Sequence, residues 1–245
     1  MAVPYHLDER LASFDVGLPI DHEVTAELPP GGPWQRMAAL YDRVAGVVGS
    51  QSLPVLVVSG DCTTSLGVLA GLQRAGHDVG IVWLDAHADF HTETTTTSGY
   101  RGGMPLALAV GVGTLTLPGA LGLRPVPESN VVLVDARDTD PGEHILLERS
   151  SVRRTRLPDL KEADLPGCPL YLHLDIDVCD PEEVPGLLYP APGGPALADV
   201  LDAVQRVMAT GRVAAIGAAV TWRQDRPATP AQRSVMPRLR EAITI

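Results

Sequence analysis

The sequence contains few aromatic residues, few basic residues and no long apolar run. Aromatic residues make up 4% of the 245 positions, whereas hydrophobic residues make up 45%. This balance is typical of buried parallel strands covered by helices. Lysine and arginine together number 19 against 30 acidic residues, which gives a formal net charge of −11. Because no basic stripe is present, nucleic acid and anionic membranes are not expected as partners.

Cysteine is also scarce, with Cys62, Cys168 and Cys179 as its three positions. An odd number without framework spacing argues against a disulfide scaffold and for a reducing compartment, so we expect a cytoplasmic protein. No apolar stretch approaches the roughly 18 residues of a membrane-spanning helix. The N-terminal stretch also has charges early and no apolar core, so we expect no signal peptide.

The rest of the chain consists mainly of apolar segments, some with the pattern of a helix and others with the pattern of a buried strand. Patterning predicts helices at residues 34–49, 63–76, 103–113, 196–211 and 229–243, and strands at 53–61, 79–85, 130–138, 169–177 and 213–220. Strands that alternate with helices favour a parallel sheet with helices on both faces. We therefore expect an α/β fold, a three-layer αβα sandwich with a mostly parallel sheet, forming a single domain over residues 1–245.

Acidic residues follow the predicted strands. Asp85, His87 and Asp89 occupy every second position where one apolar run stops, and Asp175 and Asp177 repeat the spacing after another. Period-two spacing puts such side chains on one side if the chain stays extended, and ligands of open α/β sheets bind beyond the carboxyl ends of strands. Two such segments facing each other could surround two cations, with ligands that suit Mn, Fe or Zn.

The alternative for each piece is structural. A lone Asp-x-Asp at a strand end is usually a cap or a surface turn, and a lone histidine beside it usually makes a structural hydrogen bond. Gathering this many carboxylates without a cation would cost several kcal/mol in repulsion and desolvation. The metal interpretation is therefore favoured.

Five segments together resemble one known family. "SGDCT", "WLDAHADF", "TTTTSG", "ARDTDPGEH" and "HLDIDVCDP" occur in the order found in the ureohydrolases, the arginase and agmatinase family. The resemblance implies an arginase-like αβα domain with two Mn²⁺ ions, which activate a water that attacks a guanidine carbon. It implies one metal bound by Cys62, Asp85, Asp89 and Asp175, and a second bound by Asp85, His87, Asp175 and Asp177. The candidate catalytic residues are Asp85, Asp89 and Asp175.

The resemblance also implies where the far end of a substrate binds. Members that take α-amino acids have polar groups that match His91, Thr96 and Ser98, and a "DPGE" stretch that supplies Asp140, supported here by Asp138 and Glu143. The alternative for "DPGE" alone is a helix start, with proline in the first turn. Together with "TTTTSG" it favours an amino acid over a simple amine such as agmatine.

Three positions depart from the arginase pattern. Cys62 stands where the family has a histidine ligand, and a thiolate there would make the ligand set one unit more negative. Gly102 occupies the place of a histidine that carries a proton to the leaving amine, with His91 and Tyr100 as nearby candidates. Trp222 or Thr221 stands where a glutamate meets the guanidinium. Their structural alternatives are a buried apolar cysteine and a core or lid aromatic.

These departures favour a less basic substrate than arginine. We expect cleavage of N-omega-hydroxy-L-arginine to hydroxyurea and L-ornithine. The alternatives are a conventional arginase, which makes urea from L-arginine, and a catalytically silent metal-binding protein. The expected partner is thus a small amino acid with a guanidine or hydroxyguanidine group. A monomer is expected, with a trimer as the alternative.

Overall fold

The centre of the molecule is a parallel sheet. The computed structural model describes residues 1–225 and 227–244. In this part of the chain, seven strands pair in the order β1-β4-β9-β8-β5-β6-β7, and every pair is parallel. Their bounds, in that order, are Ala2–Val3, Val55–Ser59, Val213–Ala219, Leu170–Asp175, Gly80–His87, Val131–Asp138 and Arg153–Thr155. A separate antiparallel hairpin joins β2 (Tyr5–His6) to β3 (Glu9–Arg10).

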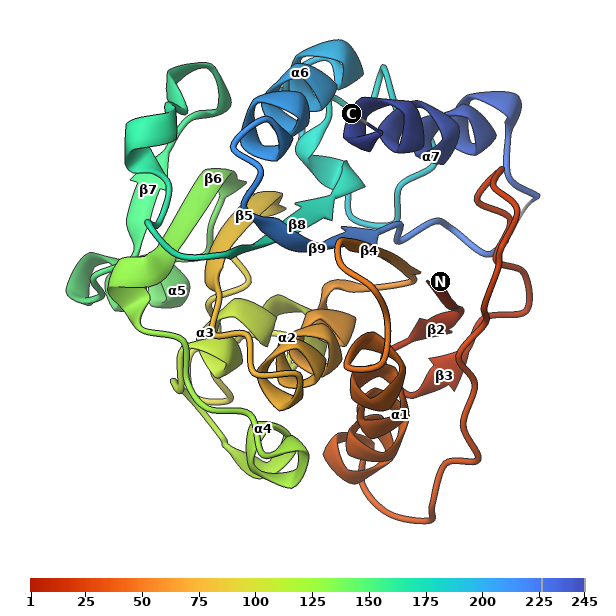
Figure 1. Ribbon diagram of the computed structural model, residues 1–245, viewed down its shortest axis with the longest axis vertical. Coiled ribbons are helices and arrows are strands. Elements are labelled where there is room, and N and C mark those ends of the chain that lie inside the picture. Colours follow the sequence, from red (N-terminus) through yellow and green to blue (C-terminus); the bar gives the residue numbers. More distant parts are fainter. Residues whose placement is uncertain (226, 245) are drawn as a thin grey trace.

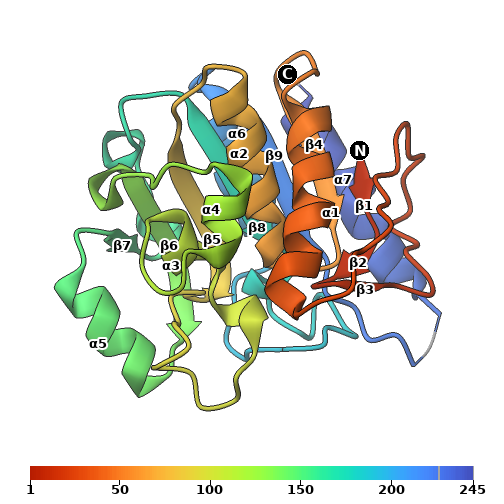
Figure 2. The same cartoon turned by 90° about the horizontal axis from the view of Figure 1, so that it is seen from below.

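Helices cover both faces of this sheet (Figure 1). One face carries α1 (Pro33–Val48), α2 (Ser65–Arg74), α3 (Pro105–Ala109) and α4 (Thr116–Leu121), and the other carries α6 (Leu197–Met208) and α7 (Pro230–Ile243). Figure 2 shows the two layers one behind the other, with α5 (Pro141–Arg149) near the edge formed by β6 and β7. The expected three-layer αβα architecture is confirmed.

Alternation along the central strands divides the core in two. In β5, Ile81 and Trp83 pack with the α1–α4 layer, whereas Val82 and Leu84 pack with the α6–α7 layer. All four side chains are fully buried, as period-two alternation in a strand with two covered faces requires. The apolar runs in the sequence therefore fix which strands are central.

The predicted elements are present, with one shortened. The helix expected at 103–113 covers only Pro105–Ala109, because Gly111 and Gly113 follow with φ of +85° and +91°, outside helical geometry. The prediction omitted β1, β2, β3, β7, α4 and α5. The omitted strands have only two or three residues each, too few to show a period.

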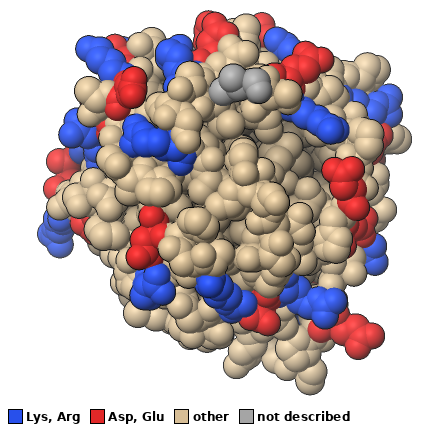
Figure 3. All heavy atoms as spheres, in the orientation of Figure 1, with Lys and Arg blue, Asp and Glu red and all other residues tan. Residues whose placement is uncertain are grey.

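The outer surface has mixed charge. On the face shown in Figure 3, acidic and basic side chains are interspersed around uncharged residues. Among the described residues, none of the helices combines the length and the apolar character needed to cross a bilayer.

Candidate metal centre and substrate pocket

A pocket of about 400 Å³ opens where β4, β5, β6, β8 and β9 end. The carboxyl ends of parallel strands meet at one edge, so segments far apart in sequence share this space. Twelve of the thirteen site residues predicted from the sequence line it: Cys62, Asp85, His87, Asp89, His91, Thr96, Ser98, Asp138, Asp140, Glu143, Asp175 and Asp177.

Cys62 lies at the floor of the pocket. It opens the 3₁₀ turn η1 (Cys62–Thr64) directly after β4, and its side chain is buried. The thiol donates to Asp175 Oδ2 at 2.8 Å and faces Asp85 Oδ2 at 3.9 Å. Burial first, and then the neighbouring carboxylates, raise the pKa of this thiol well above its usual value. Cys62 is thus a buried thiol that faces two carboxylates, in reach of a shared cation.

A second group of ligand atoms surrounds His87. Its Nδ1 lies 3.0 Å from Asp177 Oδ2 and 3.5 Å from Asp85 Oδ1. Burial opposes the charged imidazolium, but hydrogen bonds to Asp177 and Asp85 outweigh it and raise the pKa of His87 to about 12. In this arrangement the imidazolium takes the place that a cation would fill.

The geometry expected from the sequence is present only in part, because β5 keeps Asp85 and His87 extended but both acidic segments turn beyond their strands. Asp177 lies in the 3₁₀ turn η6 (Ile176–Val178), where its backbone N–H donates to Asp175 Oδ1 at 2.9 Å. β5 ends at His87, and Asp89 has a left-handed φ of +51°. Asp85 and His87, two residues apart in β5, reach the pocket by strand alternation, whereas turns direct Asp89 and Asp177 into it.

The carboxylates are poorly solvated. Burial raises the pKa of Asp175 to about 8 and that of Asp177 to about 7, in each case with help from a neighbouring carboxylate. Burial also raises the pKa of Asp85 and Asp89. Such shifts mean that the one imidazolium nearby, His87, does not offset the burial and mutual repulsion of these anions. A divalent cation would supply it, so the donor set fits the metal site that the sequence predicts.

Two buried polar atoms in this region have no hydrogen-bond partner among the described residues. They are Asp89 Oδ2 and His173 Nε2. Buried polar groups nearly always have a partner, so both atoms favour an additional ligand. His173 was not predicted as a site residue, although a histidine inside the buried run "LYLHLD" two residues before Asp175 was a usable signal.

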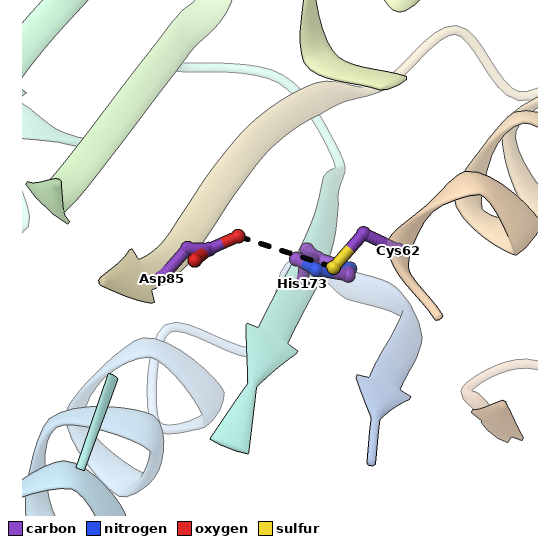
Figure 4. A group of neighbouring side chains, drawn as sticks. All are labelled: Cys62, Asp85 and His173. Atoms are coloured by element: carbon purple, nitrogen blue, oxygen red, sulfur yellow. Dashed lines mark hydrogen bonds between the residues drawn. The ribbon is translucent and has the colours of Figure 1, made fainter. Parts of the chain in front are cut away.

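The ligand atoms form two groups that share Asp85. One comprises Cys62, Asp85 and His173, and the other comprises Asp85, His87 and Asp177; within each group the ligand atoms lie within 4.8 Å of one another. Figure 4 shows the first group converging from η1, β5 and β8. Thiol, imidazole and carboxylate are ligands of Zn, Fe, Co and Mn.

The rim of the pocket is polar and more exposed. His91 bridges Thr95 Oγ1 at 3.1 Å and Asp140 Oδ2 at 3.2 Å. Ser98 is exposed and Thr96 is half-buried, and their hydroxyl oxygens lie 3.4 Å apart. Asp138 is exposed and its carboxylate lies 3.9 Å from His87 Nε2. This rim can hydrogen-bond a polar substrate while the metal-ligand groups lie deeper.

Asp140 and Glu143 combine a structural role with their place in the pocket. Asp140 is the N-cap residue of α5 and Pro141 is in the first turn, so "DPGE" does start a helix. Glu143 is buried, and its Oε1 accepts the backbone N–H of Phe90 at 2.7 Å. The helix start is thereby fastened to the segment that carries Asp89 and His91.

Trp222 does not lie in the pocket. It packs in the core of the α6–α7 layer and lines a separate cavity of about 180 Å³. Thr221 lines the main pocket instead, and its hydroxyl donates to the carbonyl of Gly60 at 3.1 Å. Because successive side chains of an extended segment point to opposite sides, only one of the two can face the substrate space.

The fold and the pocket together define an arginase-like α/β protein. The structure of Entamoeba histolytica arginase in complex with L-ornithine superposes with a TM-score of 0.82 at 20% identity, covering 99% of this chain and 96% of that one. Bacillus subtilis arginase superposes with a TM-score of 0.78 at 25% identity, covering 91% and 83%. Formimidoylglutamase from the same organism gives 0.65 at 14% identity, covering 90% and 70%.

The sequence itself places the chain in a family. The profile of the arginase family matches residues 5–219, and the chain belongs to that family. It is 32% identical over 168 residues to the arginase of Bacillus subtilis, covering 63% of this chain and 56% of that protein. It is 33% identical over 153 residues to the arginase of Brevibacillus brevis, covering 57% and 51%. The matched part therefore spans little more than half of these curated relatives.

Proposed function

We propose that this chain is a hydrolase that uses two divalent cations, manganese by family resemblance, to cleave the guanidine C–N bond of an α-amino acid. The observation that carries the proposal is the buried set of carboxylates whose pKa values are raised by burial, beside Asp89 Oδ2 and His173 Nε2, which have no partner in the described part of the chain. Cys62, Asp85, Asp89 and Asp175 would hold one cation. Asp85, His87, Asp175 and Asp177 would hold the other.

The chemistry that such cations supply is activation of a water molecule and polarisation of the substrate. The protein groups complete the site around them. Backbone N–H groups of His87 and Asp177 donate to Asp85 Oδ1 at 2.7 Å and to Asp175 Oδ1 at 2.9 Å. Trp83 Nε1 donates to Asp85 Oδ2 at 3.0 Å. These hydrogen bonds fix the carboxylate orientations, so the guanidine carbon would meet a rigid site.

The substrate class follows from the rim. Asp140 and Asp138 provide exposed carboxylates for an α-amino group, and His91, Thr96 and Ser98 provide donors for an α-carboxylate. The solved complex of the Entamoeba arginase with L-ornithine supports an amino acid in this space.

Within this class, we propose N-omega-hydroxy-L-arginine as the preferred substrate, cleaved to hydroxyurea and L-ornithine. Thr221 and Gly102 line the pocket where arginases present a carboxylate and an imidazole, and Cys62 replaces a histidine. A hydroxyguanidine is less basic than a guanidine and needs less of that missing apparatus. The physiological counterpart of this proposal is a step in antibiotic formation such as the D-cycloserine pathway, in the cytoplasm.

The test combines metal analysis with product assays. Purified protein loaded with manganese is given L-arginine and hydroxyarginine, and kcat/KM is measured for each by ornithine release. A higher kcat/KM for hydroxyarginine supports the proposal. Equal values, or a preference for arginine, identify a conventional arginase. If the metal-loaded protein cleaves neither substrate, it is a catalytically silent metal-binding protein and the proposed activity is overturned.

A further inference from the structure

His173 is a buried histidine with one free nitrogen at the metal centre. It lies on β8, is 1% exposed, and its ring stacks on Trp83 with centroids 3.6 Å apart. Nε2 has no partner among the described residues, and a ring nitrogen of His173 lies within 4.8 Å of the ligand atoms of Cys62 and Asp85. Figure 4 shows the His173 ring overlapping the Cys62 sulfur in projection, with Asp85 to one side.

The other ring nitrogen is held by a chain of hydroxyl groups. His173 Nδ1 lies 3.0 Å from Ser65 Oγ, and Tyr171 donates its hydroxyl proton to the same oxygen at 2.8 Å. Gly217 makes room for this chain, because a Cβ there would lie 2.0 Å from the Tyr171 hydroxyl. A serine oxygen can accept two hydrogen bonds, so Nδ1–H can donate to it and leave the Nε2 lone pair free.

We propose that His173 is a further ligand of the cation bound at Cys62 and Asp85. This inference rests on the proposed metal dependence. Cys62 occupies a position where the family resemblance expects an imidazole, and His173 supplies an imidazole to the same space from the neighbouring strand. Ser65 acts as the outer partner that fixes the ligating tautomer, as hydrogen-bonded partners of metal-bound histidines usually do.

The unaltered protein provides the decisive measurement. X-ray absorption spectroscopy on protein loaded with cobalt(II) counts scatterers directly. We expect one sulfur, from Cys62, and the outer-shell signal of two imidazoles, from His87 and His173. In the His87→Asn variant one imidazole signal should remain. A single imidazole in the unaltered protein, lost in His87→Asn, would overturn the role of His173.

Variants and uptake separate this inference from the proposed function. In His173→Gln, cobalt affinity should fall about 10–100-fold, while His77→Gln, a half-buried histidine outside the pocket, is the control and should be unchanged. Ser65→Ala should give a smaller loss in the same direction. Failure of the unaltered protein to take up cobalt or manganese would overturn the proposed function and this ligand together. If the unaltered protein takes up metal and His173→Gln binds cobalt with unchanged affinity, only the role of His173 as a ligand is overturned.

A different observation concerns the proton that the leaving nitrogen requires. Gly102 has no side chain, but the space beside it is filled: a Cβ there would lie 2.2 Å from Tyr100 Cζ and 2.3 Å from its Oη. Tyr100 and Gly102 both line the main pocket. The phenol of Tyr100 thus occupies the volume that a side chain at position 102 would use.

Tyr100 also connects the pocket to a second cavity. Its Oη lies 2.7 Å from His6 Nε2, and His6 lines the cavity of about 180 Å³ that Trp222 and Gln224 also line. The hairpin that carries His6 is fixed beside Cys62, because the N–H of Leu7 donates to Asp61 Oδ2 at 2.6 Å. Burial raises the pKa of Tyr100, so the phenol keeps its proton at neutral pH.

We infer that Tyr100 donates the proton to the leaving nitrogen and that His6 restores it. This inference rests on the proposed hydrolysis. After a water oxygen has added to the guanidine carbon, the C–N bond breaks and its electron pair stays on nitrogen, which takes the phenol proton. The phenolate takes the Nε2 proton of His6 as Nδ1 of the same half-buried ring takes a proton from solvent, so the imidazole stays neutral. The adduct loses its hydroxyl proton to solvent as the product carbonyl forms.

Paired variants test the relay on whichever guanidine substrate the unaltered protein cleaves. Tyr100→Phe keeps the ring and removes the hydroxyl, so kcat should fall about 10²-fold with KM within about twofold, the size of a lost general acid. His6→Gln should lower kcat with little change in KM. Tyr5→Phe, on the same hairpin with its hydroxyl near Ala26, is the matched control and should keep its kcat.

Restoration of an imidazole sharpens the test. Tyr100→Ala vacates the space beside Gly102, and adding Gly102→His to it should recover part of the lost kcat. A kcat in Tyr100→Phe above half of the original value would overturn the relay while the proposed function stands. Absence of guanidine cleavage by the unaltered protein would overturn both. If Tyr100→Phe lowered kcat and raised KM by the same factor, the relay would also be overturned, because that result indicates a packing role for Tyr100.

Discussion

The two ligand groups that share Asp85 differ in how far the protein alone satisfies them. We call Cys62, Asp85 and His173 the thiol group, and Asp85, His87 and Asp177 the imidazole group. The imidazole group contains its own positive charge, because His87 at a raised pKa of about 12 pairs with Asp177 at 3.0 Å. The thiol group is fully buried and keeps one nitrogen without a partner among the described residues.

This difference predicts different responses to a cation. In the imidazole group, a cation replaces a proton on His87 that the site has bound tightly. In the thiol group, it displaces the proton on Cys62, whose pKa is raised by burial and by nearby carboxylates, and it satisfies a free nitrogen. Ligands must be deprotonated to bind metal. Metal uptake should therefore release protons from both groups.

Asp85→Asn should have the largest effect, because it removes the residue that both groups share. Loss of one charge from a buried charged cluster typically costs about 3–5 kcal/mol, which corresponds to roughly 10²–10⁴ in metal affinity. Manganese content after dialysis should fall towards zero, and guanidine cleavage should fall with it. Unchanged metal content measured by mass spectrometry would show that the two groups do not share a ligand.

Removal of metal should reverse the pH dependence of stability. The pKa of Asp175 is raised to about 8 in the folded chain, so the folded state keeps a proton that the unfolded state loses above about pH 4. Stability of the metal-free protein therefore falls as pH rises from about 4 to 8. His87 acts in the same direction, because the stability from its pKa near 12 is complete below its ordinary value of 6.5 and declines above it.

Thermal unfolding of both forms checks this reversal. The metal-free protein should melt at a lower temperature at pH 8 than at pH 5, with about 2–4 °C for each kcal/mol lost. The melting temperature of the manganese-loaded protein should rise over the same pH interval, because deprotonated ligands bind the cation more tightly. If the melting temperature changed with pH in the same way in the metal-free and manganese-loaded forms, this would count against a cation in this carboxylate cluster.

Variants that touch one group should separate the two. His87→Asn should remove the cation of the imidazole group and keep that of the thiol group, so metal content should fall by about half. Cys62→Ser should weaken binding of the cation at the thiol group by a smaller factor, roughly 10–100-fold, since Asp85 and His173 remain, with Asp89 and Asp175 as further candidate ligands. Cobalt titration followed by thiolate absorbance reports on the thiol group alone. Identical losses in both variants would mean that the groups load as one.

The sequence predicted more of the imidazole group than of the thiol group, for a physical reason. "DAHAD" and "DID" are unusual in apolar runs, so Asp85, His87 and Asp177 stood out. His173 lies inside the run "LYLHLD", where a buried histidine has an ordinary structural interpretation. Its significance depends on Ser65 and Tyr171, which approach from other elements. Contacts of that kind do not appear in a linear pattern.

The same contrast holds for the fold. Five long strands and five helices were predicted because each is long enough to show a period. β1 and the hairpin β2–β3 were missed, yet that hairpin delivers His6 to Tyr100. The family resemblance left Trp222 or Thr221 for one position in the pocket, and the chain direction after β9 turns Thr221 inward. Local periodicity predicts elements, while the side on which a loop residue lies depends on the folded chain.

The smallest expected effect lies at the rim, where Asp140 is exposed. Its carboxylate should hold the α-amino group of the substrate, and an exposed charged hydrogen bond contributes less than a buried one. Asp140→Asn should raise KM about tenfold, leave kcat within about twofold and leave metal content unchanged. Steady-state kinetics on the preferred substrate measure this, with Asp159→Asn, an exposed carboxylate outside the pocket, as the control. Asp140 contacts His91 at 3.2 Å. A large fall in kcat would mean that the rim takes part in the chemistry through this contact, and that the rim and the metal-ligand groups do not act separately.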